Sequence, residues 1–526
     1  MVSAALPSEV DVLVVGAGAA GSVYAARLAQ AGRSVLVLDS GPAWEVGDLL
    51  SSQIWARRLK WSGPLLQQPP GPPAFSHTYA TGRGFGGAAL HHFGTWLRLR
   101  PSDFKLRSLH GVGADWPIGY DELRPFYDRV QDEMGIAGDA RREIGRPAGK
   151  PYPMPPHALF KQAQLLAKGF EAIGLPMSPL PLAINSRSFK GRPACLYDGW
   201  CEAGCPIGAL ANPLVTHIRA AQAAGARFVA SITVTRVLCD ERGRARAVEC
   251  FDANGVRHEV AASLVVLAAS VVQNPRLLLN SADARHPQGL ANRSGQVGAG
   301  LMIDALTPVY GLFDVATESH RGVNAGQLLY RGDHVDPKRP DAPGAYQWQI
   351  APSLKPNDLL GIANTRADLY GAELHRFMQR AARSMASVGG FASALPEAGN
   401  RIEVGSEKAA DGMPVARLQY RHSPRTLRLR EHLVTEGMRA FKAAGASQVW
   451  PGPLAGGHLV GGTPMGADPA SSVCDSFGRC HDVPNLILAG SGIFPGGSGT
   501  SPTFTLYALA ERSAAHAAKH WSDLRA

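Results

Sequence analysis

The sequence predicts an α/β fold with a second, α+β domain, and three observations lead to that prediction. A strand, a glycine-rich loop, a helix and a second strand follow one another within residues 11–39. Beyond residue 300, alternating runs such as residues 345–350 indicate an antiparallel sheet. The 526 residues are 45% hydrophobic and 18% charged, which is a globular composition and excludes collagen-like, disordered and disulfide-scaffold proteins.

Charge and hydropathy argue against a nucleic-acid-binding protein and against a membrane-spanning one. The net charge is +10 and the basic residues are scattered, so we interpret them as a solvated surface without a nucleic-acid partner. No segment approaches the ~20 consecutive apolar residues of a membrane helix. The N-terminal residues lack the basic and apolar regions of a signal peptide. We therefore expect a soluble protein that is cytoplasmic, or periplasmic by export with a signal-bearing partner subunit.

The strongest motif lies within residues 11–39. Strand, helix and strand are predicted over residues 11–15, 22–31 and 34–38. The first loop carries a G-x-G-x-x-G pattern at Gly16, Gly18 and Gly21. The first glycine permits a tight turn, the second lets the backbone approach a pyrophosphate, and the third lets helix and strand pack closely. Asp39 ends the second strand and is placed to accept from a ribose hydroxyl, so this unit predicts a Rossmann-like site for NAD or FAD.

Two further segments suggest that the nucleotide domain is assembled from both ends of the chain, which is unusual for NAD enzymes. Gly86 and Gly87 lie in a glycine-rich run over residues 82–92. A C-terminal segment, residues 483–505, joins an apolar strand to an apolar helix and contains Gly490, Ser491, Pro502 and Thr503.

With these segments in place, the sequence resembles the glucose-methanol-choline (GMC) family of FAD oxidoreductases. The resemblance covers nearly the whole chain and includes residues 264–279, 297–304 and 461–505. Within the family, residues 100–156 and 191–209 are similar to the catalytic subunits of bacterial FAD sugar dehydrogenases, such as the glucose, fructose and gluconate 2-dehydrogenases. Pyranose oxidase is a more distant relative.

The resemblance implies the GMC fold, with a discontinuous FAD-binding domain and a separate substrate domain. The FAD domain would comprise residues 1–105, 190–300 and 450–526, and residues 300–450 would form the substrate domain on an antiparallel sheet. Residues 106–189 are rich in proline in places and are interpreted as a surface excursion or linker.

The resemblance also implies contacts to FAD from Gly86, Gly87, Gly490, Ser491, Pro502 and Thr503. His91 stands where pyranose oxidase carries a flavin-linked histidine, so a covalent bond and a noncovalent contact both stay open. Val234 matches the family position that contacts the adenine, although it can equally be read as a plain strand valine.

Two residues are predicted to act on the substrate. Oxidation of an alcohol by a flavin requires a base for the hydroxyl proton while a hydride leaves the carbon. The family's base is a histidine shortly before a Gly-Thr pair, and His458 matches it. The second family position holds His or Asn, whereas this chain has Ser501, which can hold a substrate oxygen but cannot act as a second imidazole. Alternatively, Ser501 caps the terminal helix.

Cys195, Cys201 and Cys205 have the spacing C-x5-C-x3-C, which is not a standard ferredoxin pattern. From the residues alone, an iron–sulfur site, free thiols and a local disulfide all stay open. The resemblance favours a [3Fe-4S] cluster, because the related catalytic subunits have cluster-binding cysteines at these positions. The other four of the seven cysteines are interpreted as packing residues.

The sequence thus predicts an FAD-dependent enzyme that oxidises a C–OH group of a sugar, glycoside, sugar acid or polyol. Its electrons would leave through the cluster to a cytochrome c or quinone-linked partner, and a small chaperone-like subunit is a further expected partner. A cluster-free oxidase that uses oxygen and a non-catalytic flavoprotein subunit are the alternatives.

Overall fold

The first sheet combines strands from both ends of the chain. The computed structural model describes residues 6–61, 63, 65–67, 81–497 and 499–525. Four strands run parallel to a central one, and two antiparallel strands extend the sheet on one side. The order is β7–β2–β1–β10–β9–β8, with β19 beside β10. The strands are β1 (Glu9–Val15), β2 (Val35–Leu38), β7 (Arg227–Val229), β8 (Thr233–Cys239), β9 (Ala245–Phe251), β10 (Arg257–Leu267) and β19 (Leu486–Leu488).

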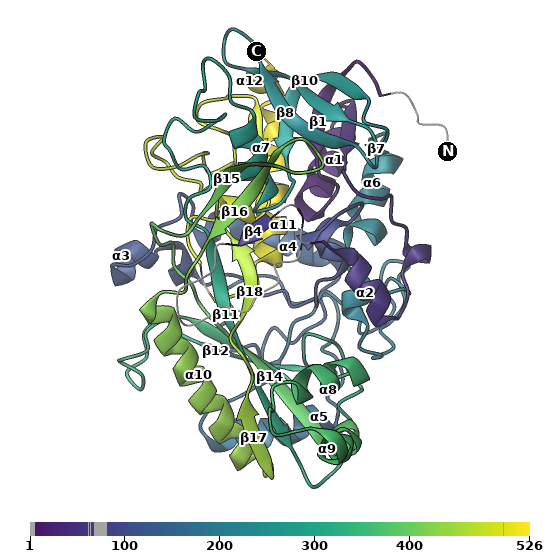
Figure 1. The fold of residues 1–526 in the computed structure, drawn as a ribbon, viewed down its shortest axis with the longest axis vertical. Helices are drawn as coiled ribbons and strands as arrows, with labels where there is room; N and C mark the ends of the chain where they lie inside the picture. Colours follow the sequence, from purple (N-terminus) through teal and green to yellow (C-terminus); the bar gives the residue numbers. More distant parts are fainter. Residues whose placement is uncertain (1–5, 62, 64, 68–80, 498, 526) are drawn as a thin grey trace.

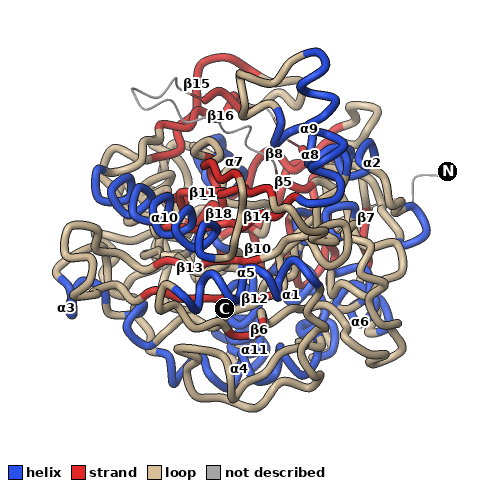
Figure 2. The backbone as a smooth tube through the Cα atoms, turned by 90° about the horizontal axis from the view of Figure 1, so that it is seen from below, coloured by secondary structure: helices blue, strands red, loops and turns tan. Residues whose placement is uncertain are grey.

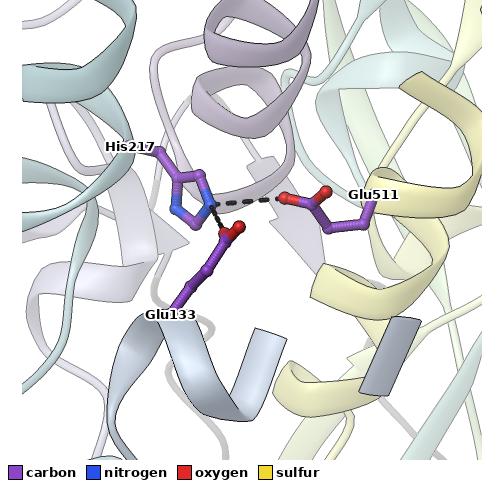
Figure 3. A group of neighbouring side chains, drawn as sticks. All are labelled: Glu133, His217 and Glu511. Atoms are coloured by element: carbon purple, nitrogen blue, oxygen red, sulfur yellow. Dashed lines mark ion pairs between the residues drawn. The ribbon is translucent and has the colours of Figure 1, made fainter. Parts of the chain in front are cut away.

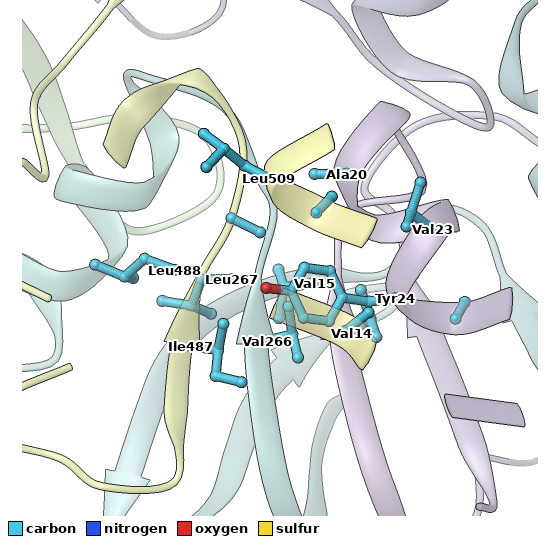
Figure 4. Close-up of a cluster of buried hydrophobic side chains, with 14 of the residues drawn as sticks. Val14, Val15, Ala20, Val23, Tyr24, Val266, Leu267, Ile487, Leu488 and Leu509 are labelled. Atoms are coloured by element: carbon cyan, nitrogen blue, oxygen red, sulfur yellow. The ribbon is translucent and has the colours of Figure 1, made fainter. Parts of the chain in front are cut away.

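The core of this half lies between the sheet and two helices. Side chains of β1, β10 and β19 pack with Tyr24 of one helix and Leu509 of the other (Figure 4). Because both faces of the parallel strands are covered, these strands are continuous apolar runs. The helices of this half are α1 (Ala19–Gln30), α4 (Tyr120–Met134), α6 (His217–Ala223), α7 (Gln273–Asn280), α11 (Thr503–Lys519) and α12 (Trp521–Arg525).

The second sheet is antiparallel and lies in the lower half of Figure 1. Its order is β17–β11–β14–β13–β12–β6, with β18 beside β11. These strands are β6 (Ser178–Pro179), β11 (Met302–Leu312), β12 (Leu328–Gly332), β13 (Tyr346–Ile350), β14 (Met385–Ala392), β17 (Gln448–Pro451) and β18 (Ala455–Val460). Seen from below in Figure 2, α10 (Pro424–Ala443) lies along this sheet and packs against α5 (Lys161–Ala172). The other two helices of this half are α8 (Pro356–Ala363) and α9 (Gly371–Ser384).

Two small sheets and two short helices complete the described chain. A three-stranded sheet consists of β15 (Arg401–Lys408), β16 (Pro414–Gln419) and β4 (Leu65–Gln67), and a two-stranded sheet of β3 (Lys60–Trp61) and β5 (Thr81–Gly82). The short helices are α2 (Gln53–Leu59) and α3 (Leu106–His110). Among the described residues, no helix is both long enough and apolar enough to cross a bilayer.

The predicted fold class is confirmed. Some segments, however, pack outside the domain predicted for them from the sequence. Residues 106–189 do not run only over the surface, since α4 packs against α11 and α5 against α10, with Tyr127 and Phe170 fully buried. β17 and β18 pair with β11 in the second sheet, although they fall within residues 450–526 or at their edge. The exact domain boundaries stay a prediction.

Candidate active site

A cavity of about 1740 Å³ lies between the carboxyl ends of the parallel strands and the second sheet. Ligands of open α/β sheets bind at this edge. Most of the predicted site residues line the cavity: Gly16, Gly18, Asp39, Gly87, His91, Val234, His458, Gly490, Ser491, Ser501, Pro502 and Thr503. The structure thus brings together segments that are more than 400 residues apart in the sequence. The predicted residues outside the lining are Gly21, Gly86, Cys195, Cys201 and Cys205.

Backbone contacts explain why glycine is needed in the N-terminal loop. Gly16 has φ +102°, and a Cβ there would lie 2.6 Å from the carbonyl oxygen of Ala268. A Cβ on Gly21 would lie 1.9 Å from the carbonyl oxygen of Gly16, so any side chain would separate the helix from the strand. Gly18 faces Gly87, where a Cβ would lie 3.0 Å from the Cα of Gly18. The two glycine-rich segments therefore meet and present bare backbone to the cavity.

Asp39 holds three loops together at the cavity wall. Its Oδ2 accepts from the backbone N–H of Ala17 at 2.9 Å, and its Oδ1 accepts from Gly41 and Gly84, both at 2.8 Å. A carboxylate offers about four acceptor positions. One position is therefore left for the predicted ribose hydroxyl, and the sequence did not show that Asp39 also has this structural role.

His91 and His92 differ in what they contact. Nε2 of His92 bonds to the carbonyl of Ala211 at 2.9 Å, and its Nδ1 accepts from Gly94. Nε2 of His91 is buried and has no hydrogen-bond partner among the described residues. Burial, with the charge of Lys60, lowers the pKa of His91 to about 4, so its imidazole is neutral. An unpaired buried nitrogen at this wall, beside exposed glycine backbone, fits the predicted FAD.

His458 forms a dyad with Asp304 at the other end of the cavity. Nδ1 of His458 lies 2.8 Å from Oδ2 of Asp304, and its backbone N–H donates to Oδ1 at 2.6 Å. A bulge in the pairing of β11 with β18 sets two residues of β18 opposite Asp304. A Cβ on Gly457 would lie 2.1 Å from Asp304 Oδ1, so glycine is required there. Asp304 belongs to a segment that carries the family resemblance, but only the strand register reveals its role.

Ser501 lies in the cavity wall and contacts two glutamines of β13. Its Oγ accepts from Nε2 of Gln347 at 3.0 Å and from Nε2 of Gln349 at 3.4 Å. The alternative that Ser501 caps the terminal helix is wrong, because α11 begins at Thr503 after Pro502 and no side chain caps it. The sequence reasoning used residues 345–350 only as evidence for a strand and missed both glutamines.

The three cysteines form a cluster under one loop. The backbone N–H groups of Tyr197 and Leu210 point at Sγ of Cys195 and Cys205, both at 3.3 Å. Cys201 is buried, and the three side chains pack together with apolar neighbours. Burial raises the pKa of Cys195 to about 11, with a smaller contribution from Cys205. The loop therefore gathers three thiols, and its backbone can hydrogen-bond to sulfur.

A second histidine–carboxylate group lies between helices (Figure 3), and its residues are not among those that line the cavity. Nε2 of His217 is 3.6 Å from Glu133 and 3.5 Å from Glu511. Among the described residues, this is the group in which three possible metal ligands lie within 4.8 Å of one another. However, the guanidinium of Arg27 pairs with the same two carboxylate oxygens. Arg129 also lies 3.9 Å from Glu511, so the two carboxylates already have cationic partners, and we interpret the group as an ion-pair cluster rather than a metal site.

Comparisons with known proteins agree with this geometry. The family model "GMC oxidoreductase" matches residues 10–305 and 396–510. The chain is 30% identical to the fructose dehydrogenase large subunit of Gluconobacter japonicus, covering 96% of this chain and 97% of that protein. It is also 30% identical to 2-methyl-1,2-propanediol dehydrogenase of Mycolicibacterium austroafricanum, covering 98% and 96%. Pyridoxine 4-oxidase from Mesorbium loti shares the fold, with a TM-score of 0.67, 18% identity and coverage of 97% and 99%. The chain belongs to the GMC oxidoreductase family and is an FAD-dependent oxidoreductase that acts on CH–OH donors.

Proposed function

We propose that the protein is a dehydrogenase that oxidises a C–OH group of a sugar, glycoside, sugar acid or polyol. The observation that carries the proposal is the His458–Asp304 dyad, which faces a cavity with the glycine-rich walls of a nucleotide site. The names of the relatives, a fructose dehydrogenase subunit and a diol dehydrogenase, support a polyhydroxylated substrate.

His458 and Asp304 would handle the hydroxyl proton. Because Nδ1 of His458 donates to Asp304, its Nε2 carries the lone pair that can accept a proton. Asp304 holds the ring in place and would stabilise the imidazolium that forms. Ser501, which also lines the cavity, would hold the substrate oxygen by a hydrogen bond. FAD, when bound, supplies the hydride acceptor, and the residues of the cavity lining would hold it, including Gly18, Gly87 and Ser491.

We propose further that the cysteine loop holds a [3Fe-4S] cluster through Cys195, Cys201 and Cys205. Thiolates on one loop, with N–H groups aimed at sulfur, form a suitable donor set. The loop also leads to the cavity, since Leu210 contacts Cys205 and the next residue, Ala211, bonds to His92 in the cavity wall. A cytochrome c or quinone-linked subunit would accept the electrons, and a signal-bearing small subunit would carry the chain if it is exported.

Anaerobic mixing with substrates tests the proposed reaction. A panel of polyols, sugars, sugar acids and monohydric alcohols is added without air, and loss of the flavin absorbance is followed. Reduction by polyhydroxylated donors is expected, whereas a flavin that no C–OH donor reduces would contradict the proposal. Oxygen uptake in air then distinguishes an oxidase from a dehydrogenase.

The cluster has its own test. Iron and flavin are counted in protein purified without air, and about three irons per FAD are expected for a three-iron cluster. Cys201→Ser should remove the iron and leave FAD bound. Cys250→Ser is a matched control, because Cys250 is also buried but lies in β9. Equal iron content in the wild type and the Cys201→Ser variant would exclude the cluster.

A further inference from the structure

Two glutamines of the second sheet control which hydrogen bond Ser501 can make. In β13, Gln347 and Gln349 alternate with Tyr346, Trp348 and Ile350, which lie in the apolar core of the second sheet. Successive side chains of a strand point to opposite faces. Both carboxamides therefore reach Ser501 from the same face, and Gln347 and Ser501 are almost fully buried.

We propose that Gln347 and Gln349 fix the Ser501 hydroxyl as a donor to the substrate oxygen. A serine hydroxyl has one O–H donor and two acceptor lone pairs. The two amide N–H groups at 3.0 and 3.4 Å occupy both lone pairs. The O–H must then point elsewhere, and the cavity that Ser501 shares with His458 lies beside it. This inference rests on the proposed function.

The orientation of the Gln347 amide follows from its neighbour. Arg331 of β12 is the directly opposite residue in the strand pair, and its guanidinium is buried and bonds to Thr500. Opposite residues on one face of a sheet lie close together. Oε1 of Gln347 has no hydrogen-bond partner among the described residues, and the cation across the strand pair attracts this oxygen, which leaves the NH₂ group for Ser501. Gln347 and Gln349 are thus positioning residues. Ser501 would donate a hydrogen bond to the substrate oxygen from which His458 takes the proton, and would so stabilise the negative charge on that oxygen.

Two substitutions at one position test this polarity. Gln347→Glu replaces the N–H donor with a carboxyl group whose ionised form only accepts, so the Ser501 hydroxyl would turn away from the substrate. Gln347→Leu removes the donor without adding an acceptor. We expect the rate of flavin reduction at saturating substrate to fall about 10²-fold in Gln347→Glu and less than about 10-fold in Gln347→Leu. Ser501→Ala should resemble Gln347→Glu.

A merely structural role predicts the reverse order, because Glu has the shape and polarity of Gln and Leu does not. That reversed order, or equal rates in both variants, would overturn the proposal. Flavin content and substrate Kd are measured in parallel, and neither is expected to separate the two variants. If no C–OH donor reduces even the wild-type flavin, the proposed function fails instead.

A second observation concerns Cys474 and Cys480, which face each other across a tight hairpin. They are partners in an antiparallel bridge. The flanking bonds run from Asp475 N–H to the Arg479 carbonyl and from His481 N–H to the Val473 carbonyl. The cysteines are therefore a non-hydrogen-bonded pair, the type with Cα atoms about 4.5 Å apart and side chains on one face. Disulfides span Cα distances of about 4.4–6.8 Å.

Both cysteines are free thiols in this structure, with Sγ of Cys474 3.8 Å from the carbonyl oxygen of Thr463. We propose that Cys474 and Cys480 form a disulfide when the chain folds under oxidising conditions. The two thiols lose two electrons and two protons, and a small disulfide such as oxidised glutathione is reduced to two thiols. Both side chains are buried in the folded protein, so the bond would form while the hairpin is still open. This assignment leaves Cys195, Cys201 and Cys205 available as a separate set.

The bond would hold together the segment that follows His458 and the segment that leads to Gly490. Gly466, which follows the His458 strand, donates to the Cys474 carbonyl at 2.9 Å. Cys480 donates to Leu486 at the start of β19, also at 2.9 Å, and β19 leads to Gly490 in the cavity wall. A crosslink between positions 474 and 480 would hold these segments together independently of the cofactor.

Peptide mapping tests the disulfide. Holoenzyme folded with oxidised and reduced glutathione is unfolded without reductant, treated with a thiol reagent and analysed by mass spectrometry. We expect a crosslinked peptide about 2 Da lighter than its reduced form, and a higher unfolding midpoint that reduction removes. Cys480→Val should leave Cys474 labelled, and Cys474→Val/Cys480→Val should lose the redox dependence of the midpoint. Labelling of both cysteines in the wild type, or a Cys239–Cys480 crosslink, would overturn the proposal.

Discussion

The two histidine–carboxylate groups of this protein use the same side chains for opposite purposes. His217 is only 4% exposed and lies against Glu133 and Glu511, which also pair with Arg27 and, in the case of Glu511, with Arg129. The side chain of His458 is 29% exposed, has one carboxylate partner, and lines the cavity. An imidazole whose available nitrogen already contacts carboxylates cannot exchange a proton with a substrate. One whose second nitrogen faces a cavity can accept a proton.

The two groups also differ in which helices and strands they connect. The His217 cluster joins α1, α4, α6 and α11, which are far apart in the sequence (Figure 3). The His458 dyad joins two neighbouring strands, and the ring of Phe391 in β14 lies beside the imidazole with 5.3 Å between ring centroids. The first group should therefore affect stability and the second catalysis, and the following changes test that separation.

The largest expected effect is that of His458→Ala. Without the base, the rate of flavin reduction by substrate should fall about 10³-fold or more. FAD content should stay at the wild-type value because the nucleotide end of the cavity is untouched. Stopped-flow mixing without air measures the rate, and a variant that keeps full activity would refute the assignment of the base.

His217→Gln should instead lower the stability. Removing His217 leaves the buried carboxylates of Glu133 and Glu511 with only their arginine partners and should reduce the free energy of unfolding by about 3 kcal/mol. Urea unfolding measures the loss. The rate of flavin reduction per bound FAD should not change, and a large change in that rate would break the comparison.

Asp304→Asn sharpens the comparison from the catalytic side. Asparagine has one acceptor oxygen instead of two, so it cannot accept from both Nδ1 and the backbone N–H of His458, and a neutral amide stabilises an imidazolium less than a carboxylate does. We expect flavin reduction to slow about 10²-fold with little change in stability. An unchanged rate would mean that His458 needs neither the charge of Asp304 nor both of its acceptor oxygens.

The smallest effect is a pH dependence of stability from the His217 cluster. Burial opposes protonation of His217, but Glu133 and Glu511 outweigh it and raise its pKa above 6.5. A raised pKa in the folded state gives stability that is present below pH 6.5 and is lost as pH rises through the folded pKa. Each unit of pKa shift corresponds to about 1.4 kcal/mol.

The measurement is the urea midpoint of the wild type and His217→Gln at several pH values. The stability gap between the two proteins should be larger near pH 6 than above the raised pKa of His217. Burial also opposes ionisation of Glu133 and Glu511, yet His217 and Arg27 lower the pKa of both carboxyls. Their contribution is therefore lost only at acidic pH, below the range compared. A gap that widens at high pH would contradict the assigned charges.

Sequence alone determined the features that depend on neighbouring residues. Strand, glycine loop and helix at residues 11–39 follow from local spacing, because Gly21 is required by a contact within that unit, with the carbonyl oxygen of Gly16. His458 could be singled out because a short motif surrounds it. The alternating residues 345–350 indicated a strand, since one face must be apolar when it packs on helices.

Tertiary structure decided everything that depends on register or on contacts between distant segments. Asp304 pairs with His458 across 154 positions because a bulge aligns β11 with β18. Gln349 reaches Ser501 across 152 positions, and Glu511 reaches Arg27 across 484. A one-residue shift of β11, β13 or β18 would turn the side chains of that strand to the other face of the sheet. The sequence therefore predicted the proposed base and the nucleotide fold, whereas the groups that lie around them were set by how the sheets and helices pack.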